Sequence, residues 1–266
     1  MYAFEFHRPK SVSDAAALLA KSQGKLIAGG QSLVGALKLR LASSEHLIDV
    51  GAIPDLRGIK RDGNNIAIGA TTRHAEVAQS ADVRKAIPAL ADLANGIGDR
   101  QVRNMGTIGG SIANNDPAAD YPAAVLGLNA AIRTNKRTIA ADDFFKGMYE
   151  TALAPDEIIT AVSFPTPKRA AYIKFRNPAS RFALVGVFVA DTGTGVRVAV
   201  TGAGSAGVFR ATAMEQALAK NFSPDAVKGI KIDASRLNSD LHASAEYRAH
   251  LITVLTARAV AQASAK

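Results

Sequence analysis

Three strand-like runs in the second half of the chain restrict the folds open to it. The segments AAYIKF, FALVGVFVA and GVRVAVTGA lie within residues 170–203 and are joined by short connections. Parallel strands need long crossovers, so these runs predict an antiparallel meander. The preceding apolar run ends at Pro165-Thr166-Pro167, where we place the main domain boundary, between residues 1–167 and 168–266.

The last of these runs leads into a glycine motif. Gly202, Gly204 and Gly207 have the spacing G-x-G-x-x-G, and the helix-like segment FRATAMEQALAK follows. A dinucleotide fold needs a parallel strand–helix–strand unit and an acidic residue about 20 positions further on, at the end of the second strand. No apolar strand precedes Asp225, so we interpret the motif as a strand-to-helix turn.

The pattern of expected helices and strands changes near residue 53, which predicts that the first 167 residues form subdomains of about 1–52 and 53–167. The first part alternates strand and helix: SVSDAAALLAKSQG reads as a helix capped by Ser11 or Ser13, and KLIAGG and HLIDV read as strands. The second part begins with the hairpin GIKRDGNNIAIGA. A helix then starts at TTRHAEVAQS, with Thr71 or Thr72 as its cap, and a polar loop is expected over NMGTIGGSIANNDPAAD.

Composition excludes several classes of function. The chain has no cysteine, so it holds no disulfide, thiolate nucleophile or iron–sulfur cluster. The net charge is +9, yet no run of Lys and Arg exceeds two residues and tryptophan is absent, which argues against a nucleic-acid partner. There is no apolar run long enough for a membrane span and no signal-peptide core at the N-terminus, so we expect a cytoplasmic protein.

Two other glycine-rich segments have the parts of an anion-binding site. In IAGGQSLVGALKLR, Gly30 and Gly35 have the Walker A spacing, but Ala36-Leu37 replaces the required Lys-Ser/Thr, which excludes a nucleoside-triphosphate site. The segment MGTIGGSIANNDPAADYPAA adds further glycines, hydroxyls and amides before a helix. Taken singly, each segment also suits a tight turn or a helix cap. Together they indicate a ligand with two phosphates.

These two segments resemble the FAD-binding medium subunit of the molybdenum hydroxylases, in particular its carbon monoxide dehydrogenase branch. The resemblance continues through ALAPDEIITAVSFP, KFRNPASRFALVGVFVA and SAEYRAHLITVLTARAV, and so covers nearly the whole chain. It implies an α+β protein. A two-part FAD-binding domain of the PCMH type, as in vanillyl-alcohol oxidase, is followed by a C-terminal domain of antiparallel sheet and helices.

The resemblance also implies which residues contact FAD, with no catalytic residue and no metal ligand. The first segment contacts the pyrophosphate through Ala28, Gly29, Gly30, Gln31, Ser32 and Leu33, with Ile27 alongside. The second segment contacts it through Thr107, Gly109, Gly110, Ser111 and Asn114. Asp120 suits a hydroxyl or adenosine contact, and Ile97 and Ile159 (or Ile158) pack on flavin or adenine. Lys174 donates to the electron-rich end of the isoalloxazine ring, the alternative being a strand residue that faces solvent.

Three positions depart from the family pattern. Many relatives have His at Gln31 and Asn at Ser111, and close relatives often have Tyr at Phe182. The implied function is electron transfer from partner iron–sulfur clusters through FAD to an external acceptor, in a heterohexamer with an iron–sulfur small subunit and a molybdopterin large subunit. The alternative is a free-standing flavin oxidase. The five histidines form no obvious cluster in the sequence, so no base is evident for that activity.

Overall fold

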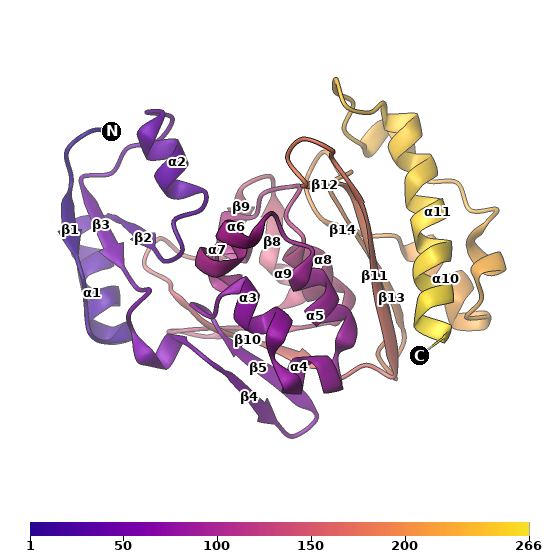
Figure 1. Ribbon diagram of the computed structural model, residues 1–266, viewed down its shortest axis with the longest axis horizontal. Helices are drawn as coiled ribbons and strands as arrows, with labels where there is room; N and C mark the ends of the chain where they lie inside the picture. The colour runs from indigo at the N-terminus through magenta and orange to yellow at the C-terminus, as the bar shows by residue number, and fades with distance from the viewer. Residues whose placement is uncertain (266) are drawn as a thin grey trace.

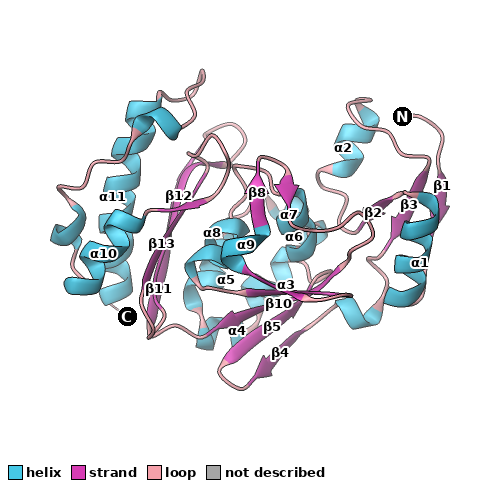
Figure 2. Cartoon of the chain, turned by 180° about the vertical axis from the view of Figure 1, so that it is seen from behind, coloured by secondary structure: helices cyan, strands magenta, loops and turns pink. Residues whose placement is uncertain are grey.

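The computed structural model describes residues 1–265, which form three successive units (Figures 1 and 2). Figure 1 shows a small sheet with its helices at the N-terminal end and a larger sheet covered by helices in the middle. An antiparallel sheet backed by two helices lies at the C-terminal end. This arrangement confirms the expected mixture of helices and sheets. No helix within residues 1–265 has the length and apolar character to cross a bilayer.

The first unit is a parallel sheet built by helical crossovers. Its strands β1 (Glu5–His7), β3 (His46–Asp49) and β2 (Lys25–Ile27) lie in that order. Helix α1 (Val12–Ser22) connects β1 to β2, and α2 (Leu33–Lys38) connects β2 to β3. The Ser11 hydroxyl caps α1 by accepting from the Asp14 backbone N–H, as expected for a serine before an Ala/Leu run.

The middle unit is a five-stranded sheet with a helical cover. The hairpin of β4 (Ile59–Asp62) and β5 (Asn65–Gly69) confirms the predicted turn, and β10 (Ile159–Pro165) inserts between β5 and β6 (Ala131–Thr134). The edge strand β7 is Thr138–Ala140, and a separate pair comprises β8 (Phe145–Gly147) and β9 (Glu150–Thr151). The helices are α3 (His74–Gln79), α4 (Ala81–Ala86), α5 (Pro88–Asn95), α6 (Arg100–Met105), α7 (Ile108–Asn114), α8 (Tyr121–Gly127) and α9 (Ala141–Phe144).

Two local predictions in this unit are wrong. The polar loop expected before Tyr121 contains helix α7, which Thr107 caps by accepting from the Gly110 N–H. A capping hydroxyl thus outweighs the low helix propensity of two glycines. Neither Thr71 nor Thr72 caps α3, because their hydroxyls donate to Leu56 O and Gly58 O instead. Arg73 occupies the N-cap position.

The third unit confirms the antiparallel meander. Strands β11 (Arg169–Arg176), β12 (Ala183–Asp191), β13 (Val196–Thr201) and β14 (Phe209–Arg210) pair in chain order. One face of this sheet adds Tyr172 and Phe188 to the core of the middle unit. The other face packs on α10 (Thr212–Lys220) and α11 (Ala245–Ser264). The short 3₁₀ segments of the chain are Pro54–Leu56, Pro224–Val227 and Ala234–Arg236.

The G-x-G-x-x-G motif connects β13 to β14. It therefore joins two antiparallel strands, and the interpretation as a strand-to-helix turn is wrong. Gly202 and Gly207 have positive φ values of 83° and 102°. A Cβ on Gly202 would lie 2.4 Å from the Ala183 carbonyl oxygen. Strand approach and turn geometry thus account for these glycines, and a dinucleotide-binding crossover is excluded.

Candidate functional site

A cavity of about 1100 Å³ lies where the three units meet. Most of its lining comes from four segments: residues 24–33 around the β2–α2 loop, residues 97–120 of the middle helices, residues 149–159 before β10, and the β11–β12 region. Residues 70–74 at the start of α3 contribute as well. In Figure 1 the β2–α2 segment faces α6 and α7. Every residue that the sequence predicted as an FAD contact lines this cavity. Lining the cavity does not assign those contacts, which stay a prediction.

The β2–α2 loop presents unpaired backbone donors. Gly30 turns the chain with φ of 68°. Among the described residues, none accepts a hydrogen bond from the backbone N–H groups of residues 29–33. Gly29, Gly30 and Leu33 are half-buried, while Gln31 and Ser32 are exposed. Consecutive N–H groups that meet no protein acceptor at a cavity wall suit an anionic ligand.

Close backbone contact holds this loop against the middle unit. A Cβ on Gly29 would lie 2.2 Å from the Met105 carbonyl oxygen and 2.7 Å from the Gly106 Cα. No side chain fits in that space. Gly29 therefore lets the β2–α2 loop approach the α6–α7 junction, and this approach brings the two glycine-rich segments together.

The second segment contributes side chains more than backbone donors. The N–H groups of Ile108 and Gly109 donate to Thr72 O and Ala70 O, at 3.1 and 2.8 Å. The Gly110 N–H is held by its cap, so these N–H groups of α7 are already paired within the protein. Ser111 and Asn114 also line the cavity, and their side chains have no hydrogen-bond partner among residues 1–265. Their hydroxyl and amide groups are free for a ligand.

Asp120 and Lys174 form a buried ion pair at the cavity wall. Lys174 Nζ lies 2.9 Å from Asp120 Oδ2 and donates to Gly96 O at 3.2 Å, while the Tyr172 hydroxyl donates to Asp120 Oδ1 at 2.5 Å. The side chains of Lys174 and Asp120 are only 4% and 3% exposed, so the alternative of a solvent-facing Lys174 is wrong. Burial raises the pKa of Asp120, and the Lys174 ammonium and Tyr172 hydroxyl counteract part of that rise.

This pairing constrains the roles predicted for the two residues. Adenine and isoalloxazine occupy opposite ends of an extended FAD. An adenosine contact for Asp120 and a ring contact for Lys174 therefore cannot both hold, because the two side chains touch. The hydroxyl contact that the sequence also allowed for Asp120 is compatible with the pair.

Apolar residues complete part of the wall. Ile97 packs at the edge of the middle core, while Ile159 is 6% exposed and Ile158 is 2% exposed. Ile158 and Ile159 both line the cavity, although they belong to different hydrophobic clusters. Either of these two residues therefore remains a candidate for the predicted contact with flavin or adenine.

His74 is a cavity residue that the sequence analysis did not select. Its ring is buried and lies 5.3 Å from the Tyr121 ring between centroids, and its Nδ1 has no hydrogen-bond partner within the described residues 1–265. Burial, with a smaller contribution from Arg103, lowers the pKa of His74 to about 4, so the ring is neutral near pH 7. No sequence signal marked this residue, because its burial depends on the approach of α6 and α8.

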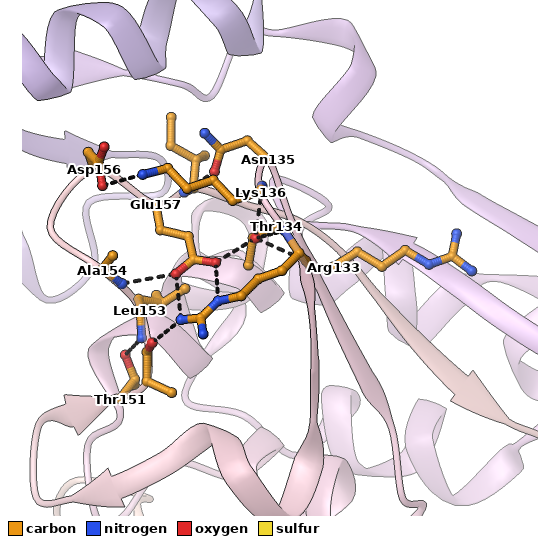
Figure 3. Close-up of polar contacts among 12 residues, drawn as sticks. Arg133, Thr134, Asn135, Lys136, Thr151, Leu153, Ala154, Asp156 and Glu157 are labelled. Carbon is orange, nitrogen blue, oxygen red and sulfur yellow. Dashed lines mark hydrogen bonds and ion pairs between the residues drawn. The ribbon is translucent and has the colours of Figure 1, made fainter.

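A polar network around Glu157 fixes the cavity wall before β10 (Figure 3). The carboxylate accepts from Arg137 Nε and Nη2 at 2.9 Å each, from the Thr134 hydroxyl at 2.7 Å and from the Ala154 N–H at 2.9 Å. Hydrogen bonding by Arg137 lowers the pKa of Glu157 to about 2, against an ordinary value of 4.5. The network ties the 153–158 segment to strand β6 and to the turn between β6 and β7.

We expect Glu157→Gln to destabilise the chain by about 2 kcal/mol at pH 7, since it removes charge-assisted hydrogen bonds worth about 1.5–3 kcal/mol each from a partly solvated site. The pKa of Glu157 is depressed, so its stabilisation is complete above pH 4.5 and is lost as the pH falls toward about 2. Urea unfolding at several pH values measures the difference. The exposed Glu150→Gln is the matched control, and an equal loss in both variants would contradict the prediction.

Comparison with known proteins supports an FAD-binding role for this cavity. Residues 2–167 match the family described as FAD binding domain in molybdopterin dehydrogenase, and residues 170–263 match the CO dehydrogenase flavoprotein C-terminal domain. The chain belongs to the FAD-binding medium subunits of the molybdenum hydroxylases. It is thus part of an oxidoreductase family, and its cofactor is FAD.

Individual relatives span nearly the whole chain. The carbon monoxide dehydrogenase medium chain of Hydrogenophaga pseudoflava is 36% identical over 99% of this chain and 98% of the relative. The nicotine 6-hydroxylase medium subunit of Paenarthrobacter nicotinovorans is also 36% identical, with the same coverage. A solved structure of carbon monoxide dehydrogenase from Hydrogenophaga pseudoflava superposes with a TM-score of 0.89, at 36% identity, over 99% of this chain and 98% of that one.

The cavity fits FAD on its own features. Its volume of about 1100 Å³ slightly exceeds the roughly 300–1,000 Å³ usual for ligand pockets, which suits a ligand as large as a dinucleotide. The free N–H groups of residues 29–33 suit a pyrophosphate, and the free Ser111 and Asn114 side chains suit phosphate or hydroxyl groups.

Proposed function

We propose that this chain is the electron-transfer subunit of a carbon monoxide dehydrogenase-type complex. Electrons pass from iron–sulfur clusters of a partner through FAD to an external acceptor. The observation that carries the proposal is the row of N–H groups at residues 29–33 that have no acceptor within residues 1–265, in a cavity that Ser111 and Asn114 also line. The chain has no cysteine, so iron–sulfur clusters must lie in another subunit.

FAD, when bound, supplies the capacity to accept electrons singly and to release them singly or in pairs. The residues of this chain hold it and tune its surroundings. The β2–α2 loop binds the pyrophosphate through its backbone, and Ser111 and Asn114 add side-chain contacts. In this proposal the remaining predicted residues (Ile27, Ala28, Ile97, Thr107, Gly109, Gly110 and Ile159) shape the wall around it.

Lys174 and Asp120 act at the isoalloxazine end in this proposal. The Lys174 ammonium donates toward the electron-rich part of the ring, while Asp120 keeps that ammonium oriented and offers its carboxylate to a nearby hydroxyl. A cation beside the ring favours a reduced, anionic flavin. Because Asp120 neutralises part of the charge, Lys174 has a smaller effect than an isolated cation at the same distance.

The proposal extends to domain organisation and assembly. We assign residues 1–167 to a two-part FAD-binding domain of the PCMH type, with subdomains 1–52 and 53–167, and residues 168–266 to the C-terminal domain. An iron–sulfur small subunit and a molybdopterin large subunit complete a heterohexamer. The relatives act on compounds as different as carbon monoxide and nicotine by their names, which supports a substrate site outside this subunit.

Affinity purification of the tagged chain from its native host tests this assignment. We expect two further subunits to co-purify, with molybdenum, iron and one noncovalently held FAD for each copy of the chain. The FAD should appear in the supernatant after acid denaturation. Isolated chain reconstituted with FAD should show no steady turnover of organic substrates, since its flavin lacks the partner relay.

The matched control is the same tag on an unrelated cytosolic protein of that host. Recovery of the chain alone, with steady turnover of a defined organic substrate, would replace the proposal with a free-standing flavin oxidase. A chain that stays colourless after incubation with FAD would contradict both readings.

A further inference from the structure

Glu5, His7 and His46 converge on one face of the N-terminal sheet, which corrects the expectation that the histidines form no cluster. His7 Nε2 lies 3.1 Å from His46 Nδ1. Glu5 Oε2 lies 3.3 Å from His46 Nδ1 and 3.7 Å from His7 Nε2. Three donor atoms on three side chains therefore form a nearly equilateral triangle.

The strand register creates this triangle. Parallel strands β1 and β3 pair Glu5 with His46, and His7 lies two positions after Glu5, so all three side chains share a face. None of the three residues lines the cavity of the candidate FAD site. The cluster is therefore separate from the flavin contacts proposed above.

We propose that Glu5, His7 and His46 bind a zinc-type divalent cation, with water as the fourth ligand. Zinc bonds of about 2.0–2.1 Å to nitrogen and oxygen place tetrahedral ligand atoms about 3.3–3.4 Å apart. The three observed separations of 3.1, 3.3 and 3.7 Å surround that value, so the triangle matches one face of a tetrahedron. Two imidazoles and one carboxylate form a ligand set that zinc accepts.

The surroundings leave room for a fourth ligand. The Glu5 side chain is 73% exposed, and the side chains of His7 and His46 are each 27% exposed, so solvent can supply that ligand. The chain that follows helix α1 packs against the cluster, since a Cβ on Gly24 would come within 2.9 Å of the His46 Cβ.

Binding needs only a tautomer change in the protein. One ring nitrogen of the His7–His46 pair now donates to the other. A bound cation takes the lone pairs of His7 Nε2 and His46 Nδ1, and each ring keeps its proton on its outer nitrogen. The cation then links the short edge strand β1 to β3 through side chains.

Isothermal titration of the untagged full chain with zinc chloride tests the proposal. We expect one saturable site, and a rise in melting temperature of about 5 °C when zinc is at a hundredfold excess over Kd. Glu5→Gln, His7→Gln and His46→Gln should each weaken binding at least about tenfold. A cobalt titration, read as a difference spectrum, should show the absorption of a four-coordinate ion.

The exposed His242→Gln and His250→Gln are matched controls and should leave Kd within about twofold. Circular dichroism checks that each variant folds, and Glu5→Gln keeps the test valid if a histidine variant does not, because the Glu5 side chain is largely exposed. Absence of saturable zinc binding, or equal affinity in the cluster variants and the controls, overturns the proposal. None of these readouts depends on FAD or on partner subunits.

Discussion

Gly29→Ala is expected to weaken FAD binding by at least about 100-fold while most of the fold survives. The added Cβ would lie 2.2 Å from the Met105 carbonyl oxygen, so the β2–α2 loop must move away from the α6–α7 junction. This movement removes unpaired N–H donors from the position that the pyrophosphate needs. Losing two charge-assisted hydrogen bonds at about 1.5–3 kcal/mol each accounts for the magnitude.

Titration of the FAD-free chain with FAD, followed by flavin fluorescence, measures this effect. Gly35→Ala is the matched control, because a Cβ on Gly35 meets nothing within 4 Å although the residue lies six positions further along the same segment. It should bind FAD as tightly as the parent chain. Equal affinity of Gly29→Ala and the parent, with circular dichroism unchanged, would show that this loop does not hold the cofactor.

Lys174→Met is expected to lower the free energy of unfolding of the FAD-free chain by about 3–5 kcal/mol at pH 7. The substitution leaves the Asp120 carboxylate buried without its cation, and breaking a buried pair on one side has costs of this size. Burial already raises the pKa of Asp120, and loss of the ammonium raises it further. Folding of the variant at neutral pH therefore requires either a buried charge or uptake of a proton.

The pH dependence separates this mechanism from a loss of packing. In the variant, the pKa of Asp120 is higher in the folded state than the unfolded value of about 3.9. At pH values between these two, the Asp120 carboxyl holds its proton in the folded state and releases it on unfolding. The loss of stability should therefore be small near pH 4 and grow as the pH rises. The double variant Asp120→Asn/Lys174→Met should be less destabilised than Lys174→Met alone. A loss that is the same at pH 4 and pH 7, and no smaller in the double variant, would contradict this account.

Some features of the fold could be predicted because their signals are local. Short connections between the apolar runs after Pro167 allow only antiparallel neighbours, and the observed sheet follows chain order. The hairpin at β4 and β5 and the cap at Ser11 also follow from adjacent residues. Helix α7 was not predicted because a Gly/Asn/Asp-rich segment is typical of a loop, whereas its cap, Thr107, is a single residue.

By itself, the sequence determined the presence of two glycine-rich segments, which indicate a ligand with two phosphates, and the absence of any cysteine for an iron–sulfur cluster, because these depend on residue types and short spacings. The FAD assignment came from the resemblance to a known family. Only the tertiary structure decided which backbone donors stay free, since Ala70 and Thr72 accept from N–H groups of α7, while no acceptor within residues 1–265 meets those of residues 29–33.

Long-range pairing was likewise beyond the sequence. Asp120 meets Lys174 across 54 positions, and His7 meets His46 across 39. Hydrogen-bond saturation and ion pairing depend on which distant segments the packing brings within about 3 Å, and no local propensity carries that information.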